Sequence, residues 1–463
     1  MRSHITTLLS TLTITFLTPI ASSLPESVFS LASYHPSHII SRDVAVIGGG
    51  STGTYSALRL RDSSKSVVVI EQQNRLGGHT ETYIDPSSGE SSELGVVVFH
   101  DLPLVRNYFA RFNISLSKSG SGSTNVLNYD LRTGKEVTVS AASPASALGK
   151  YAAELQKYPY VESGFDLPDP VPADLILPFG EFAKKYEVED VVQLVFRFAQ
   201  GLGDLLAQPT LYVFKNFGLD IIRNLSVGFL TTTKNDNSEL YEKATEYLGS
   251  DVLLSSTVLA TLRVGDRVKV VVKTPEGIKL ILAKKLLLTI PPKLENLKGF
   301  DLNVEELGLF GKFKNAAYYN ALLRNTGIPA NTSIRNSAEG TPGNIPILPG
   351  LYYLNPTAIP GVAAVKFGSD SPLPDSVVKR EIVESIKRVA GPDSKPEFVV
   401  YKPHVPFEVT VSKQEIEKGF YRKLYGLQGK RDTWWTGAAF HTHDSSLLWE
   451  FTEKIVSRLV EEI

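Results

Sequence analysis

A glycine-rich turn is the first group of residues whose spacing could do chemistry. It reads Gly48-Gly49-Gly50-Ser51-Thr52-Gly53 and lies between an apolar, β-branched run at 43–47 and a helix-like stretch at 54–60. Gly48 permits a tight turn, Gly50 lets the backbone approach a ligand, and Gly53 lets the helix pack against the strand. The start of the helix, just after Ser51, directs unpaired N–H groups to the same place. The pattern predicts a site for the pyrophosphate of a dinucleotide.

A carboxylate completes this unit. A second strand is expected at 66–70, and it ends at Glu71, which follows Gly53 by 18 residues. A carboxylate at this distance can accept hydrogen bonds from both hydroxyls of a ribose. The order of strand, turn, helix, strand and acid favours a dinucleotide site over a flexible glycine loop.

The residues after Glu71 indicate which dinucleotide binds. Arg75, Gly77 and Gly78 follow Glu71 at a spacing that resembles the second signature of the FAD-dependent amine oxidoreductase superfamily, which includes monoamine oxidases and phytoene desaturases. The resemblance implies FAD as the cofactor, with Arg75 on its phosphates and the Gly77-Gly78 backbone close to it. It also implies an α/β, FAD-binding Rossmann-like (two-dinucleotide-binding-domain) fold with an inserted α+β substrate subdomain. His79 replaces the usual basic residue, and it is either a polar neighbour of the flavin or a covalent tether.

Two later segments look like the remaining cofactor-binding parts of that superfamily. Residues 252–289 alternate apolar and polar positions through two or three strands, and the resemblance implies that the backbone near Val258 receives the adenine side of FAD. Residues 433–460 resemble the terminal flavin-binding strand and helix, which implies that Thr436 and Gly437 lie beside the flavin.

The blocks between these segments are expected to form one substrate-binding subdomain. The predicted boundaries are a signal peptide at 1–23, cofactor-binding parts at 42–149, 249–292 and 400–463, and substrate-binding parts at 150–248 and 293–399.

Aromatic residues are frequent in the two substrate-binding parts and would suit a flat, apolar substrate, although most are expected to pack in the core. Adjacent residues on a strand face opposite sides, so only one residue each of Tyr318-Tyr319 and Tyr352-Tyr353 is expected to face a cavity. His404 either lies near the substrate or flavin, or has a structural role before a strand. The candidate catalytic residues are Tyr318, Tyr353, His404 and Trp435.

Composition excludes several other classes of protein. The 463 residues carry a net charge of -1 without long runs of one sign, which disfavours a nucleic-acid partner. There is no cysteine, so disulfides, cysteine nucleophiles and cysteine metal sites are excluded. No metal-ligand spacing and no nucleophile elbow is present, so no metal is expected. The expected partner is a small, apolar molecule, and protein partners are not predicted.

The first residues have the pattern of a leader. A short apolar run at 8–20 is followed by small residues at 21–23, which predicts a secretory signal peptide and no membrane span after its removal. An uncleaved anchor or a buried segment is the alternative. The expected location is the secretory pathway or outside the cell, and the sequons at Asn113, Asn224 and Asn331 agree weakly with a glycoprotein.

A narrower resemblance suggests the reaction. Residues 47–53, 78–83, 177–179, 401–405 and 419–432 resemble the β-cyclopiazonate dehydrogenase family of fungal secondary metabolism and are also similar to polyenoic fatty acid isomerase. The resemblance implies an oxidoreductase that abstracts a hydride from a terpenoid, prenylated indole or polyketide-like intermediate, with oxidative ring closure.

Three alternatives remain open. A redox-neutral isomerase of polyunsaturated fatty acids would return the hydride to another carbon. An amine oxidase is disfavoured because the superfamily's basic residue after Gly78 and its acidic residue after Gly437 are missing. A non-catalytic flavin-binding protein is compatible with the altered C-terminal motif.

Overall fold

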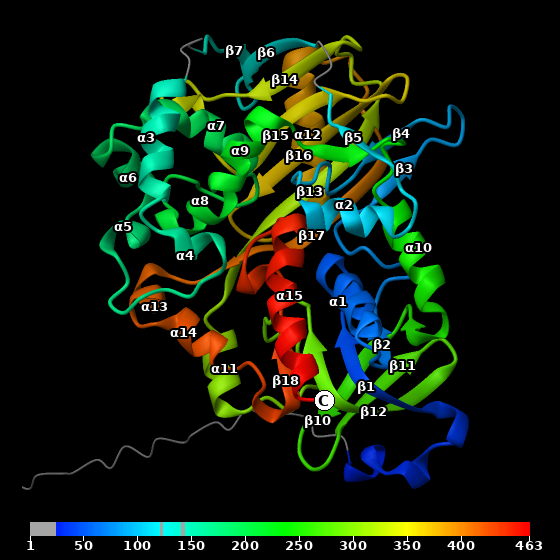
Figure 1. Ribbon diagram of the computed structural model, residues 1–463. Helices are drawn as coiled ribbons and strands as arrows, with labels where there is room; N and C mark the ends of the chain where they lie inside the picture. The colour runs from blue at the N-terminus through cyan, green and yellow to red at the C-terminus, as the bar shows by residue number, and fades with distance from the viewer. Residues whose placement is uncertain (1–24, 121–123, 140–143) are drawn as a thin grey trace, which may run out of the picture.

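The computed structural model describes residues 25–120, 124–139 and 144–463. The predicted leader at 1–23 lies outside these ranges. Two large β-sheets, each of seven strands, form the centre of the molecule, and helices cover them (Figure 1). None of the helices in the described part of the chain is long and apolar enough to cross a membrane.

The first sheet contains the predicted dinucleotide-binding unit. Its strand β1 (Ile39–Ile47) lies between β2 (Val67–Ile70) and β12 (Gly277–Leu288), parallel to both. The last four residues of β1 and all of β2 are buried, as expected for central parallel strands with helices on both sides. Helix α1 (Ser51–Asp62) connects β1 to β2, which confirms the predicted strand, turn and helix. The remaining strands of this sheet are β9 (Val252–Leu253), β10 (Thr257–Leu262), β11 (Val268–Thr274) and β18 (Thr433–Trp435).

The second sheet has the order β17-β13-β16-β15-β14-β6-β7. Its longest pairing is antiparallel, between β17 and β13, and β14 pairs parallel with β6. The strands are β6 (Asn125–Asp130), β7 (Lys135–Glu136), β13 (Lys314–Arg324), β14 (Thr332–Asn336), β15 (Gly350–Pro356), β16 (Val362–Ser369) and β17 (Glu397–Thr410).

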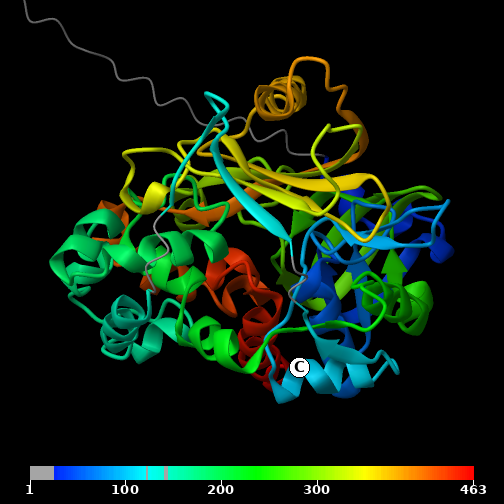
Figure 2. The same ribbon diagram turned by 90° about the horizontal axis from the view of Figure 1, so that it is seen from above.

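The two faces of the second sheet pack against different parts of the protein. On one face, Ala317 and Tyr319 of β13 pack with Val378 and Ile382 of helix α12 (Asp375–Ala390). On the other face, Tyr318 belongs to the main core, which includes the first sheet. Figure 2 shows α12 on the outer side of this sheet and the helices of the first insertion on the inner side. The inner face is therefore the one that can contribute to a site beside the cofactor segments.

Three strands belong to the second sheet although their sequences lie in predicted cofactor-binding parts. These are β6 and β7, before the predicted boundary at 149, and most of β17, after the predicted boundary at 400. The boundaries therefore differ from the sheet assignment, because β17 pairs with β13 from Lys314 to Arg324. A single strand pattern does not specify its partner strand.

The helices lie mostly around the inner face and the first sheet. Helix α15 (Ser445–Glu461) lies beside α1, and the Trp449 indole donates a hydrogen bond to Ser51 Oγ at 3.0 Å (Figure 1). The other α-helices are α2 (Pro103–Ala110), α3 (Ala145–Leu155), α4 (Pro159–Glu162), α5 (Ala173–Ile176), α6 (Phe179–Lys185), α7 (Val192–Phe198), α8 (Thr210–Asn216), α9 (Leu219–Val227), α10 (Glu239–Leu248), α11 (Val304–Phe310), α13 (Lys413–Glu417) and α14 (Phe420–Tyr425). Two antiparallel pairs are formed by the short strands β3 (Thr82–Ile84) with β4 (Ser91–Glu93) and β5 (Leu116–Lys118) with β8 (Leu230–Thr232).

One of the three sequons is not accessible. Asn224 is 1% exposed, and its amide donates a hydrogen bond to His100 Nδ1 at 2.9 Å. Asn113 and Asn331 are exposed. A glycan on Asn224 is incompatible with the folded chain, so that sequon does not support the prediction of a glycoprotein.

Candidate active site

The glycine turn has the close approaches that the sequence predicts. Gly48 has φ +100°, and a Cβ at Gly53 would overlap the carbonyl oxygen of Gly48. Gly50 is the N-cap of α1, and a Cβ there would lie 3.7 Å from the Cα of Gly78. The glycine turn and the Gly77-Gly78 backbone are therefore in direct contact, and the Gly77 N–H donates to the Gly49 carbonyl oxygen at 2.8 Å. Together they can form one wall of a site for an extended phosphate chain.

Glu71 lies at the end of β2 with its carboxylate against the turn. One carboxylate oxygen accepts a hydrogen bond from the Gly49 N–H and the other from the Gln73 N–H, both at 2.7 Å. The side chain is buried, and each oxygen keeps a lone pair for a further donor. This arrangement suits the two hydroxyls of a ribose.

Unpaired hydroxyls lie where two helix N-termini meet. Tyr241 Oη, from α10, and Thr80 Oγ1 are buried and have no hydrogen-bond partner among the described residues. Burial raises the pKa of Tyr241, and the neighbouring Ser51, Thr80 and Ser445 hydroxyls and Arg75 partly offset this increase. Ser51 and Ser445 are the first residues of α1 and α15. Hydroxyl donors, two positive helix ends and a nearby guanidinium are suited to a diphosphate, so these residues fit FAD.

Arg75 braces the loop that follows it. Its guanidinium donates hydrogen bonds to the carbonyl oxygens of Thr80 and Gly78 at 2.9 and 3.0 Å, and it pairs with Glu81 at 2.6 Å. Its predicted contact with the FAD phosphates stays a prediction. The geometry shows that Arg75 also holds the Gly77–Glu81 loop in place.

The C-terminal segment meets the glycine turn through Thr289. The Thr289 hydroxyl donates to the carbonyl oxygens of Ile47 and Gly48 at 3.0 Å, and a Cβ at Gly437, where φ is +110°, would lie 2.9 Å from the Thr289 carbonyl oxygen. Thr436 N–H donates to Leu288 of β12. The three predicted cofactor-binding parts therefore converge at one place.

The predicted adenine-side region also lies close to Glu71. The Ser256 N–H donates to the Glu71 carbonyl oxygen at 2.8 Å. Val258 follows on β10, at a bulge in its pairing with β11. The structure therefore brings Val258 near the ribose-binding carboxylate.

Three histidines come together beyond the glycine turn. The His79 ring lies 4.5 Å from that of His404 and 6.3 Å from that of His443. His404 Nε2 donates to the Leu94 carbonyl oxygen at 2.7 Å, and His443 Nε2 accepts from the Glu408 N–H at 3.0 Å. These two bonds indicate opposite tautomers for His404 and His443.

All three histidines are neutral at pH 7. Burial, together with His404 and Arg75, lowers the pKa of His79 well below its ordinary value. Burial lowers the pKa of His404 to about 4 and that of His443 to about 3. The cluster can orient groups by hydrogen bonds, but it does not supply a positive charge near neutral pH.

Aromatic rings of the inner face of the second sheet continue this cluster. The Phe407 ring lies 5.1 Å from that of Tyr318, 4.2 Å from that of His443 and 5.7 Å from that of His79. The Tyr318 hydroxyl donates to Gln200 at 3.3 Å. The histidines and these rings form an apolar, neutral surface next to the cofactor segments.

The alternation expected for the tyrosine pairs holds at one pair and is wrong at the other. Tyr318 and Tyr319 belong to different cores, on opposite faces of β13. Tyr352 and Tyr353 both pack against the main core, because a register shift between Leu351 and Tyr353 interrupts the pleat. Tyr353 thus stays beside Tyr318, with Lys366 between their rings.

Trp435 is not brought into this cluster. Its ring packs against Phe310 and Phe440, and it is 1% exposed. Its role as a catalytic contact has no support in the geometry. His404 does join the cluster, and its hydrogen bond to Leu94 also gives it the structural role that the sequence left open.

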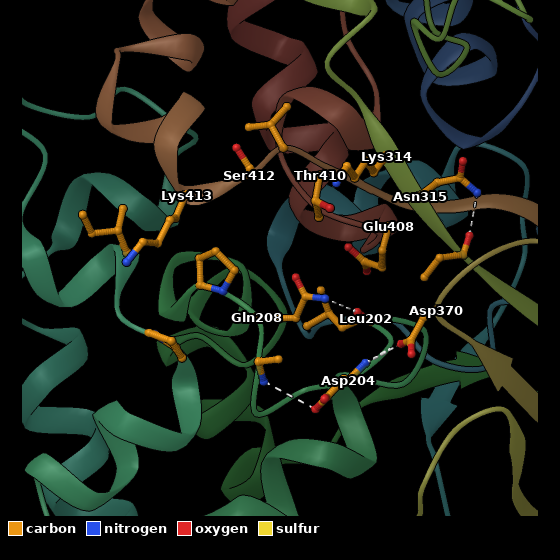
Figure 3. Close-up of a pocket in the computed structure, with 16 residues that line it drawn as sticks. Leu202, Asp204, Gln208, Lys314, Asn315, Asp370, Glu408, Thr410, Ser412 and Lys413 are labelled. Atoms are coloured by element: carbon orange, nitrogen blue, oxygen red, sulfur yellow. Dashed lines mark hydrogen bonds between the residues drawn. The ribbon is translucent and has the colours of Figure 1, made fainter.

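A pocket of about 350 Å³ opens between the first insertion and the ends of β13 and β17 (Figure 3). Glu408 lines it and is 7% exposed, with φ +47°, a conformation that few non-glycine residues adopt. Among the described residues, only the Asn216 amide donates a side-chain hydrogen bond to its carboxylate, at 3.4 Å. Burial raises the pKa of Glu408 to about 7. No sequence pattern indicated a role for this residue, because a glutamate in a strand usually faces solvent.

Comparisons with known proteins agree with this arrangement. The family model "Flavin containing amine oxidoreductase" matches residues 52–321. The FAD-dependent oxidoreductase oblC of Cochliobolus heterostrophus is 44% identical over 441 residues, covering 91% of each chain. The β-cyclopiazonate dehydrogenase of Aspergillus oryzae is 36% identical over 428 residues, covering 91% of this chain and 93% of the relative.

Solved structures show the same fold. A conjugated-linoleic-acid-producing fatty acid isomerase from P. acnes superposes with a TM-score of 0.76 at 17% identity, over 90% of this chain and 98% of the other. A putrescine oxidase superposes with a TM-score of 0.66 at 15% identity, over 92% and 100%. The solved structures confirm the predicted Rossmann-like flavoprotein fold. The family match and the relatives confirm FAD as the cofactor and an oxidoreductase, and they set aside the non-catalytic alternative. The chain belongs to the flavin-containing amine oxidoreductase family.

Proposed function

We propose that this FAD-dependent oxidoreductase removes a hydride from a terpenoid, prenylated indole or polyketide-like intermediate of secondary metabolism, after which the cation closes a ring. The observation that carries the proposal is the neutral surface of Tyr318, Phe407 and the three histidines beside the cofactor segments. Such a surface suits a flat, apolar molecule. The 36% identity to a protein named β-cyclopiazonate dehydrogenase supports it.

The residues of the chain would act mainly by positioning. When bound, FAD supplies the hydride acceptor. Tyr318 and Phe407 hold the apolar part of the substrate, and their ring faces stabilise a carbocation nearby. The neutral histidines accept or donate hydrogen bonds without adding a further positive charge to that of Lys366, whose ammonium group lies 5.6 Å from the centre of the Tyr318 ring. Closely packed rings exclude water, which would otherwise trap the cation before the ring closes.

An anaerobic titration tests this function. The purified, FAD-loaded enzyme is mixed in turn with prenylated indoles, terpenoid intermediates, polyunsaturated fatty acids and simple amines, and the flavin absorbance band is followed. We expect lasting loss of the band with a compound of the first two classes and a product two hydrogens lighter.

Other outcomes would overturn it. A band that stays oxidised while a fatty acid changes its double bonds at constant mass would indicate an isomerase, an alternative that the likeness of fold to a fatty acid isomerase keeps open. Bleaching by simple amines, with peroxide release in air, would indicate an amine oxidase.

A further inference from the structure

The inner face of the second sheet carries positive charges without negative partners. Arg335 of β14 lies opposite Tyr353 of β15, and Tyr353 lies opposite Lys366 of β16. Directly opposed residues on neighbouring strands share a face, so the two cations are on the face that carries Tyr353. Among the described residues, neither side chain pairs with a carboxylate. Burial opposes the charge of Lys366, but the neighbouring Tyr318 and Tyr353 hydroxyls outweigh it, so the pKa of Lys366 is raised.

Lys366 is enclosed by neutral groups. Its Nζ lies 5.6 Å from the centre of the Tyr318 ring and 5.8 Å from that of Tyr353. It is also near His404, because its charge contributes to the lowered pKa of that histidine. Its side chain nevertheless keeps accessible surface. A molecule that lies on Tyr318 would therefore come close to the ammonium group, which is 5.6 Å from the centre of that ring.

A third cation lies near Arg335. Burial, followed by the charge of Arg335, lowers the pKa of Arg197 of α7, and burial also lowers the pKa of Arg335. A partly buried cation whose pKa is lowered by a second cation, as that of Arg197 is by Arg335, is unfavourable in the free protein. It becomes favourable when an anion is present.

Two other enclosed cations, Arg263 and Lys285, have carboxylate partners, and the buried Lys215 bonds the Val161 carbonyl oxygen. Arg263, whose side chain has 0% exposure, bonds Asp301 and Glu306 at 2.8 and 2.7 Å. Lys285 pairs with Asp432 and Glu462 at 2.8 and 2.9 Å. The cost of withdrawing an unpaired charge from water makes such pairing the rule. Lys366 differs from Arg263 and Lys285 because no carboxylate among the described residues pairs with it.

We propose that Lys366 binds an anionic oxygen of the substrate, either a carboxylate or an ionised enol, while the apolar part of the substrate lies on Tyr318 and Phe407. Arg335 and Arg197 add positive potential that favours the same charge. This inference rests on the proposed function in taking that aromatic surface as the substrate site. It adds a requirement that an apolar surface alone does not impose: the substrate carries a negative charge.

Binding without turnover tests the inference on the FAD-loaded protein. The probes are 1-naphthylacetate and its neutral amide for a carboxylate, and 4-hydroxycoumarin and its neutral 4-methoxy derivative for an ionised enol. Affinities are measured by calorimetry and by the shift of the flavin absorbance band. We expect at least one acid to bind about 10- to 100-fold more tightly than its neutral analogue, the range of one charge-assisted hydrogen bond. The pair that shows the difference identifies the source of the anionic oxygen.

Two lysine variants give a matched comparison. Lys366→Met keeps most of the apolar stem and removes the charge. Lys379→Met is the control, because Lys379 lies 4.6 Å from the Tyr401 ring on the outer side of the same sheet. We expect Lys366→Met to abolish the preference for the acid, with binding of the neutral probe unchanged, and Lys379→Met to preserve the preference.

The results that would overturn this inference differ from those that would overturn the proposed function. Equal affinity of acid and neutral probes in the unmutated enzyme would overturn the inference even if Lys366→Met does not fold. Equal loss of both probes in a folded, flavin-loaded Lys366→Met would also overturn it, by indicating a packing role. A lysine-dependent preference for acids, without flavin reduction by any terpenoid or indole, would support the anion site and refute the proposed reaction.

Discussion

At the scale of single residues, the site contains a carboxylic acid that the sequence did not reveal. Glu408 is buried in a pocket wall, and burial raises its pKa from 4.5 to about 7. The groups that surround it are neutral or distant: Asn216, His443 and the phenols of Tyr212, Tyr352 and Tyr421 close by, and Asp204, Asp370, Lys314 and Lys413 around the pocket. Its protonated form is therefore the one that the fold prefers.

This preference predicts how stability changes with pH. Below pH 4.5 the Glu408 carboxyl is protonated in both the folded and the unfolded protein. Between pH 4.5 and 7 the unfolded protein loses this proton while the folded protein keeps it, so the contribution of Glu408 to the free energy of unfolding falls as pH rises. A shift of this size corresponds to about 3 kcal/mol above pH 7. Glu408→Gln should gain stability relative to the unmutated protein as pH rises from 5 to 8.

Urea unfolding at the two pH values measures the effect. Gln keeps an oxygen to accept the Asn216 hydrogen bond and does not titrate. Glu339→Gln, at an exposed position, is the control and should follow the unmutated protein. A difference between Glu408→Gln and the unmutated protein that is the same at pH 5 and pH 8 would contradict the raised pKa.

At the scale of elements, the glycines of the β1–α1 turn are required for two different reasons, the packing of the fold and the binding of the cofactor. Gly53 has no room for a Cβ beside Gly48, so it is required for packing. Gly50 has φ -69°, which any residue can adopt, and the nearest atom to an added Cβ is 3.7 Å away. A glycine at position 50 is therefore needed to leave space for the cofactor and is not needed for the backbone conformation.

Gly50→Val should consequently fold and lose FAD. The valine side chain would extend from Gly50, beside the Gly77-Gly78 backbone, into the space where the pyrophosphate is expected. We expect a colourless protein with unchanged circular dichroism, whereas Gly53→Ala should reduce the yield of folded protein. A yellow, fully flavinated Gly50→Val would show that the cofactor lies elsewhere.

The elements also show where sequence patterns stop being informative. The strand, turn, helix and acid from β1 to Glu71 were predictable, because neighbours in the chain are neighbours in space. The pairing of β17 with β13 was not, since it joins distant segments. The bulge between Leu351 and Tyr353, in the pairing of β15 with β16, and the positive φ of Glu408 interrupt the regular alternation. The alternation rule was therefore wrong for Tyr352, which packs in the main core together with Tyr353, and it did not reveal Glu408.

At the scale of the whole molecule, the cofactor site joins parts of the chain that are far apart in sequence. The glycine turn at 48–53, the loop at 71–79 and the start of α15 meet at Thr289 and at the unpaired hydroxyls of Tyr241 and Thr80. Few direct bonds connect these parts around the hydroxyls. A bound diphosphate would connect them and satisfy groups that are otherwise buried without partners.

FAD should therefore stabilise the entire fold and not only its site. A ligand that binds only the folded state adds about 2.7 kcal/mol to the free energy of unfolding at 100 times its Kd. We expect removal of FAD to lower the thermal midpoint, and added FAD to restore it in a concentration-dependent manner. Gly50→Val, folded but unable to bind, should have the midpoint of the FAD-free protein and not respond to added FAD. An FAD-free protein as stable as the loaded one would mean that the three segments are held together by the chain alone, and that the unpaired hydroxyls do not face the cofactor.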